Sequence, residues 1–209
     1  MKLNKQNICI FLIIIFHIVG LIGFVFFDET GIFRNLTPWH LCFMSLLLIV
    51  SQPEKNIGFY SFLAISILAG LAIEYVGVHN SSVFGAYIYG ETLGFKIAGV
   101  PLVKGINWFL VSFSTGMLVS SFGFKNILIK GFVGASLMVF LDLFIEPVAI
   151  KYDYWNWISG NIPMQNYYAW YVFSFLFMLA FFLIPFKKKN LVGVIMFITQ
   201  LMFFIVLSV

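Results

Sequence analysis

Seven long apolar runs, separated by short polar stretches, are the feature that most constrains the fold of this chain. The runs cover residues 8–27, 38–51, 57–75, 101–122, 127–146, 166–186 and 191–209. A helix needs roughly 20 mostly apolar residues to cross about 30 Å of hydrocarbon, so seven passes nearly fill 209 residues. Because 62% of the residues are hydrophobic and only 10% are charged, lipid must be the solvent for most of the surface. The sequence predicts an all-α fold, a polytopic membrane helix bundle of about seven transmembrane helices in a single domain, residues 1–209.

The second run is short for a span, and its helix has two candidate starts. Thr37 is a plausible N-cap, followed by Pro38 at the first helical position. A start near Phe33 would give this helix enough length to span.

Two other segments depart from a simple span. The run 8–27 follows Lys2 and Lys5 as a secretory signal would, but it is long and has no obvious cleavage site, so we expect a retained helix. Residues 77–100 are too polar to span and too apolar for a free linker. We expect them to form a re-entrant or interfacial segment.

The twelve lysines and arginines predict the orientation, because cytoplasmic loops carry an excess of them. An inside N-terminus puts eight on the cytoplasmic side: Lys2, Lys5, Lys55, Lys125, Lys130, Lys187, Lys188 and Lys189. The four outside are Arg34, Lys96, Lys104 and Lys151. The pattern predicts an N-in, multi-pass protein of the cell (cytoplasmic) membrane. Topology and anionic lipid account for the net charge of +4, so we expect no nucleic-acid partner.

Three carboxylates lie within or at the ends of the predicted helices: Glu74, Asp142 and Glu146. A charge near the bilayer centre costs at least about 2.5 kcal/mol, so these residues are candidates for function. Asp142 and Glu146 are four positions apart, on one face and one turn, about 5.4 Å, from each other. Their helix is expected to end at Pro147, and Glu74 closes the third helix.

The predicted topology brings these carboxylates to one side of the membrane. His40, Asn107, Trp108 and Asn166 lie toward the same side, so one polar pocket is expected to collect them. Glu74 has the alternative of interfacial water, and Glu146 has those of solvation or of pairing with Lys104 or Lys151. His40 and His79 lack metal-ligand spacing, so we expect no metal.

Several motifs in register resemble one protein family. They are Glu74–Val78, Val83–Tyr89, Leu93–Lys96, Gly99–Leu102 with Trp108, Asp142–Pro147, Tyr154–Trp157 and Pro163–Trp170. Over residues 71–175 the chain resembles the membrane carotenoid-biosynthesis family that contains the carotenoid 1,2-hydratases and the bisanhydrobacterioruberin hydratase. Glu146 stands where the family pattern has aspartate, residues 104–107 are more polar, and the loop 160–166 is shorter.

The resemblance implies a hydro-lyase that adds water across the terminal C1=C2 bond of an acyclic carotenoid end group. Such chemistry protonates C2, stabilises a cation at C1 and delivers water under a general base, and a low-dielectric pocket favours the protonated acid that it needs. The implied acid–base residues are Asp142, Glu146 and Glu74. The implied substrate contacts are Tyr87, Trp108, Trp155, Trp157, Asn107, Asn166 and His79. No cofactor is implied.

Two alternatives remain open at this stage. A membrane carotenoid (lycopene) cyclase would capture the same cation with a double bond of the chain, and a carotenoid-binding or transport protein would catalyse nothing. Polar side chains near the pocket favour holding water, and so favour hydration: Asn80, Ser81, Ser82, Asn107 and Asn166. The expected partners are the carotenoid, the lipid bilayer and other enzymes of carotenoid biosynthesis. Trp155 and Trp157 fit an interfacial aromatic belt equally well.

Overall fold

A computed structural model describes residues 4–209, so Lys2 lies outside the described part of the chain. Its elements are α1 (Lys5–Phe26), a 3₁₀ turn η1 (Asp28–Thr30), α2 (Ile32–Ser51), α3 (Ile57–His79), α4 (Ser81–Phe84), β1 (Tyr87–Tyr89), β2 (Lys96–Ile97), β3 (Val100–Pro101), α5 (Val103–Ser121), α6 (Ile127–Lys151), β4 (Trp155–Trp157), α7 (Met164–Leu183) and α8 (Leu191–Ser208). Seven helices are long and α4 is a single turn. The predicted all-α bundle is confirmed.

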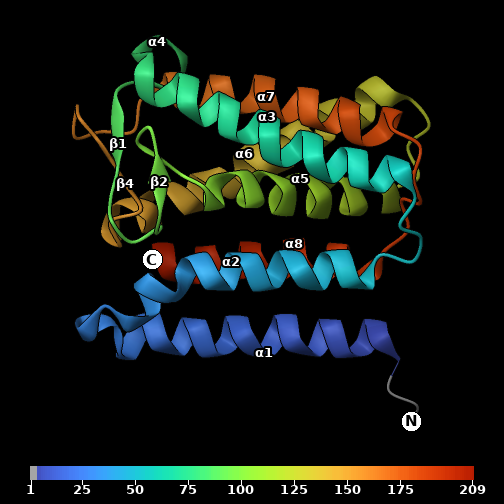
Figure 1. The fold of residues 1–209 in the computed structure, drawn as a ribbon, viewed down its shortest axis with the longest axis horizontal. Coiled ribbons are helices and arrows are strands. Elements are labelled where there is room, and N and C mark those ends of the chain that lie inside the picture. Colours follow the sequence, from blue (N-terminus) through green and yellow to red (C-terminus); the bar gives the residue numbers. More distant parts are fainter. Residues whose placement is uncertain (1–3) are drawn as a thin grey trace.

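The long helices run back and forth along one direction, and the N- and C-termini lie at opposite ends (Figure 1). Six of them are long and apolar enough to cross a membrane. The seventh, α5, packs against α2, α3, α6, α7 and α8 at the centre of the bundle. Because 14 of its 19 residues are buried, α5 carries Ser112, Ser114 and Thr115 without exposing them to lipid.

Asparagine begins the four helices that start at the N-terminal end of the bundle. Asn4, Asn56, Asn126 and Asn190 are the N-caps of α1, α3, α6 and α8, and each side chain accepts a hydrogen bond from a backbone N–H of the first turn. Such a cap satisfies one of the free N–H groups at a helix start and contributes about 1 kcal/mol.

Two glycines allow α3 and α5 to approach closely. A Cβ at Gly70 would lie 2.7 Å from the Trp108 side chain, and one at Gly105 would lie 2.8 Å from the carbonyl oxygen of Ile67. Small residues at such positions let membrane helices pack backbone to backbone. This contact fixes the height of α5 relative to α3, and therefore of Lys104 and Trp108 relative to Glu74.

Loops cover the bundle at the end opposite the N-terminus. The segment 77–100 extends α3 to His79 and then forms α4, β1 and β2, so it caps the bundle and does not re-enter it. Strand β1 pairs antiparallel with β4, with Tyr87 opposite Trp157 and Tyr89 opposite Trp155. The ribbon therefore joins the loop after α3 to the loop after α6.

Two predicted helix boundaries were wrong. Helix α2 begins at Ile32, which confirms the longer start expected near Phe33 and not the start at Thr37 and Pro38, and Pro38 lies inside the helix. Thr37 is no N-cap, and its hydroxyl shares a 2.8 Å hydrogen bond with that of Tyr154. Helix α6 continues through Pro147 to Lys151. Proline removes one hydrogen bond inside a helix, and neighbouring helices compensate for such a loss in membrane proteins.

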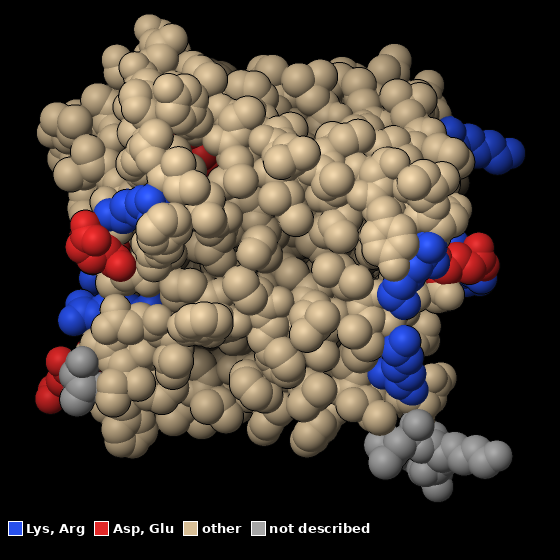
Figure 2. Space-filling model, viewed as in Figure 1, with Lys and Arg blue, Asp and Glu red and all other residues tan. Residues whose placement is uncertain are grey.

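Charged side chains gather at the two ends of the helices on the face that Figure 2 shows, and an uncharged band lies between them. Glu54 pairs with Lys187 at the end where α1 begins. Asp28 pairs with Arg34, and Glu91 with Lys96, at the opposite end. This separation is typical of a protein whose middle faces lipid.

The N-in orientation stays a prediction that labelling tests. In a background with Cys9→Ala and Cys42→Ala, a membrane-impermeant maleimide applied to intact cells should label Ser159→Cys, which is exposed in the loop after β4. It should label Lys189→Cys, exposed at the other end, only after lysis. The reverse pattern would overturn the orientation and leave the fold intact.

Candidate functional site

Glu74 is the best-satisfied acidic group of the bundle. It lies on α3 and is buried. One carboxylate oxygen, Oε2, accepts hydrogen bonds from the hydroxyls of Tyr87, at 3.0 Å, and of Tyr89. The other, Oε1, accepts one from Trp108 Nε1 at 3.0 Å and lies 3.2 Å from Lys104 Nζ. Four donors match the four lone pairs of an ionised carboxylate.

The two tyrosines on β1 act as donors to this carboxylate. Burial, followed by the charge of Glu74, raises the pKa of Tyr87 and of Tyr89. Both phenols therefore keep their hydrogens at neutral pH. The alternative of a solvated Glu74 was wrong.

Lys104, in the first turn of α5, is the one basic residue of the site within the described chain. Its ammonium lies 4.5 Å from the ring centre of Trp155, 5.6 Å from that of Tyr89 and 5.9 Å from that of Trp170. Aromatic faces stabilise a desolvated cation by about 2 kcal/mol or more. Lys104 is therefore buried in the site, and is no outer-loop cation as the topology count assumed.

Asp142 and Glu146 lie on one face of α6, one turn apart, and Asn166 bridges them. Its side-chain Nδ2 donates to Asp142 Oδ2 at 3.2 Å and to Glu146 Oε1 at 3.0 Å. The indole N–H groups of Trp155 and Trp157 both donate to Glu146 Oε2, at 3.1 and 2.8 Å. Neither solvation of Glu146 nor its pairing with Lys151 occurs.

Asp142 accepts fewer hydrogen bonds than Glu74 and Glu146. Glu146 accepts three hydrogen bonds and Glu74 accepts three and pairs with a cation, but Asp142 accepts one, from Asn166. Its Oδ1 is buried and has no hydrogen-bond partner among the described residues. An unpartnered buried carboxyl oxygen suits a protonated acid better than a carboxylate.

The ribbon of β1 and β4 explains how four aromatic residues meet these carboxylates. Side chains two apart in a strand point to the same face, so Tyr87 and Tyr89 act together, as do Trp155 and Trp157. Antiparallel pairing puts the two pairs side by side on that face. The tyrosines bind Glu74 and the tryptophans bind Glu146, and the alternative of an interfacial belt for Trp155 and Trp157 was wrong.

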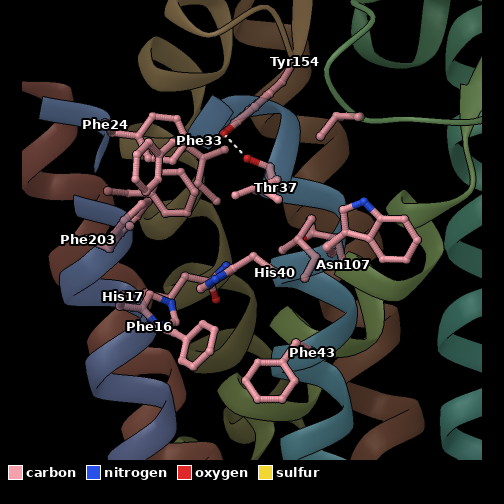
Figure 3. A pocket seen from close by; sticks show the side chains of 18 of the residues that line it. Phe16, His17, Phe24, Phe33, Thr37, His40, Phe43, Asn107, Tyr154 and Phe203 are labelled. Atoms are coloured by element: carbon pink, nitrogen blue, oxygen red, sulfur yellow. Dashed lines mark hydrogen bonds between the residues drawn. The ribbon is translucent and has the colours of Figure 1, made fainter. Parts of the chain in front are cut away.

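Two cavities lie against this cluster and share Lys104 and Trp155 in their walls. The smaller, about 20 Å³, is lined by Glu74, Glu146 and Asn166 among others, and has room for about one water. The larger, about 370 Å³, lies between α1, α2, α5 and α8 and is mainly apolar. Figure 3 shows Phe16, Phe24, Phe33, Phe43 and Phe203 around it, with His17, His40 and Asn107.

The structure brings most, but not all, of the predicted site residues together. Glu74, Tyr87, Trp108, Asp142, Glu146, Trp155, Trp157 and Asn166 form one connected cluster. His40 and Asn107 line the larger cavity instead. His79 is exposed, and its Nδ1 contacts the carbonyl oxygen of Tyr75, so it takes no part.

Sequence reasoning missed Lys104 and Tyr89 as members of the site. Lys104 reads as an interfacial lysine, although its spacing of four from Trp108 places both on one face of a helix. Tyr89 lies two residues after Tyr87, the spacing of one strand face.

In residues 4–209 no group of three or more His, Cys, Asp or Glu side chains is arranged to hold a metal ion.

Comparison with known families gives one match. The family model described as carotenoid biosynthesis protein matches residues 38–209, which include α2 from its second turn onward and every later element. None of the curated proteins and none of the solved structures matches the chain.

The ion pair of Lys104 and Glu74 predicts a double-mutant cycle. Lys104→Met leaves a buried carboxylate without its cation and should destabilise the protein by about 3–5 kcal/mol, as measured by unfolding in detergent. Adding Glu74→Gln should restore part of that loss.

The exposed pair of Lys187 and Glu54 is the matched control. Lys187→Met should change stability by about 0–1 kcal/mol. Equal, small effects of Lys104→Met and Lys187→Met would mean that the buried pair does not hold the site together.

Proposed function

The chain belongs to the carotenoid biosynthesis protein family, and we propose that within it the protein is a carotenoid hydratase of the cytoplasmic membrane. The proposed reaction adds water across the terminal C1=C2 bond of an acyclic carotenoid end group, as in lycopene or γ-carotene. The observation that carries this proposal is the pair of Asp142 and Glu146, buried together, bridged by Asn166 and bonded to two indoles.

The hydrogen bonds support a division of roles among the three carboxyl groups. Glu74 is neutralised by Lys104 and positions that cation, so it is not the acid. Asp142 and Glu146 have no cation of their own within hydrogen-bond distance, and two close acids resist ionising together. We assign one proton to this pair, on Asp142 in the resting protein because its Oδ1 has no partner.

Hydration conserves the proton of the pair. The pair gives one proton to C2 of the alkene, which leaves a tertiary cation at C1. A water oxygen then bonds to C1 and the water loses one proton, whose return to the pair restores the starting state. Electron-rich rings such as that of Trp155 stabilise the cation, at about 0.5–2 kcal/mol each.

Cyclisation, and carotenoid binding without catalysis, are the two alternative functions to hydration. A cyclase would use the same protonation but needs no water beside the cation. The small cavity beside Glu146 and Asn166, with room for about one water, supports hydration. A protein that only binds the carotenoid needs no acid beside its ligand.

Expression in cells that accumulate lycopene tests the reaction itself. We expect carotenoids that have gained one water for each processed end, measured by mass analysis of the extracted pigments. An isomer of unchanged mass would identify a cyclase, and unaltered lycopene would contradict both enzymes.

Substitution of the pair tests the site. Asp142→Asn keeps the shape and much of the hydrogen bonding but cannot supply an acidic proton. General acid–base catalysis is worth about 10²–10⁴-fold, so conversion per amount of membrane protein should fall by at least about a hundredfold. Glu146→Gln should be comparably damaging.

Glu54→Gln is the control, because it neutralises an exposed carboxylate in the loop before α3. It should leave conversion unchanged. Near-normal conversion by both Asp142→Asn and Glu146→Gln would remove the pair from the mechanism and turn attention to Glu74.

A further inference from the structure

The larger cavity lies beside the carboxyl cluster but has none of the acid groups in its wall. Its volume of about 370 Å³ is within the range of about 300–1,000 Å³ that ligand pockets have. Lys104 and Trp155 line both cavities, whereas no Asp or Glu of residues 4–209 lines the larger one. A hydrocarbon held in the larger cavity therefore meets no carboxyl group that could protonate it.

This cavity reaches the lipid-facing surface between α1 and α2. Val19 on α1 and Leu36 and Trp39 on α2 line it, and all three are exposed, Trp39 by 72%. Both helices are long and apolar enough to span the membrane, so their exposed apolar side chains face lipid. A ligand can therefore enter from the bilayer, which favours a hydrocarbon over a water-soluble molecule.

Three polar side chains in the wall of this cavity have no hydrogen-bond partner within residues 4–209. They belong to three helices: His40 to α2, Asn107 to α5 and Gln200 to α8. Gln200 is 3% exposed, and its Oε1 is buried without a partner. Buried polar atoms are nearly always hydrogen-bonded, and polar side chains inside a membrane are costly unless they serve a function. We therefore expect a ligand that brings a polar group of its own.

A hydroxyl is the polar group that matches these side chains best. An amide both donates and accepts hydrogen bonds, as does a neutral imidazole, and a hydroxyl does both as well. A carboxylate only accepts, and the one cation in the wall, Lys104, is already paired with Glu74. Figure 3 shows His40 and Asn107 among phenylalanine rings, which suit a flat or branched hydrocarbon. The wall thus fits a hydrocarbon that ends in an alcohol.

We propose that the larger cavity binds the hydroxylated end of a carotenoid, the product of the hydration, at a site separate from the carboxyl pair. The inference rests on the proposed function, which supplies this alcohol. A tertiary alcohol reverts when an acid protonates its hydroxyl: the C1–O bond breaks, water leaves, and the cation loses a proton from C2 to restore the alkene. Because no carboxyl group lines the larger cavity, an end held there is kept from this reverse reaction.

Binding of supplied carotenoids tests the site without relying on catalysis. Purified protein with Asp142→Asn, which cannot convert the probes, is immobilised in detergent and titrated with lycopene or with lycopene hydrated at C1 of one end. Retained pigment per protein is measured by visible absorption after washing, with empty resin as the blank. The hydrated probe should bind more tightly than lycopene, by at least the two- to tenfold that one hydrogen bond is worth, in rough terms.

Variants of the wall, made in the same background, should separate the hydroxyl from the hydrocarbon. Gln200→Leu and Asn107→Leu remove an amide at similar size, so each should weaken binding of the hydrated probe by about two- to tenfold and leave lycopene binding unchanged. Gly20→Leu should weaken binding of both probes. A Cβ at Gly20 lies 3.5 Å from the Phe203 ring, and a longer side chain extends into the cavity.

Two matched controls should bind both probes as the Asp142→Asn protein does. Gln6→Leu removes an amide in the first turn of α1, and Val25→Leu enlarges an exposed side chain of α1 that does not line the cavity. The two amide variants lie on different helices, so the test survives if one of them fails to fold.

Two results would overturn the inference: equal binding of both probes, or undiminished binding of the hydrated probe by both amide variants. Wild-type protein that hydrates lycopene but gives either result would keep the proposed function and lose the site. Wild-type protein that converts no lycopene, in a chain whose preference for the hydrated probe Gln200→Leu abolishes, would contradict the hydratase and keep the alcohol site.

Discussion

The ion pair between Lys104 and Glu74 is the interaction on which the loop-covered end of the bundle depends. A charge inside the hydrocarbon region costs at least about 2.5 kcal/mol, so each buried ionisable group needs a partner. Lys104 joins α5 to α3 through Glu74, and its cation lies against Trp155, whose indole binds Glu146 on α6. Three helices and the ribbon of β1 and β4 are thereby held in one arrangement. Loss of any one partner would leave another polar group buried without compensation, which is why this cluster is more than a set of independent contacts.

The three acidic groups have the same chemistry but differ in their hydrogen-bond partners. Glu74 has a cation and three neutral donors, Glu146 has three neutral donors, and Asp142 has one donor and an oxygen without a partner in the described chain. The same residue types therefore provide one fixed carboxylate and one pair that can share a proton. The mainly apolar cavity lies on the other side of Lys104 and Trp155, which line both cavities.

The helices were predictable from sequence because hydrocarbon thickness fixes their length and composition, and the seven apolar runs correspond to seven long helices. The grouping of Glu74 with Asp142 and Glu146 followed from alternation of the passes. The pairing of β1 with β4 could not be predicted, because it joins residues about 70 positions apart. The strands are also too short to show a periodicity in the sequence. For the same reason, the sequence did not reveal that Trp155 and Trp157 donate hydrogen bonds to Glu146. The separate cavity of His17 and His40 depends on how α1 and α8 pack, which composition does not encode.

The proposed reaction depends on a protonated Asp142, because an acid that is already ionised cannot start it. Infrared spectroscopy of the purified protein near neutral pH measures it directly, since a protonated carboxylic acid has a C=O stretch that a carboxylate lacks. We expect such a band in the wild type, its shift in D₂O, and its loss in Asp142→Asn but not in Glu54→Gln. A wild-type spectrum without a protonated carboxyl band, or a band that Asp142→Asn leaves unchanged, would contradict it.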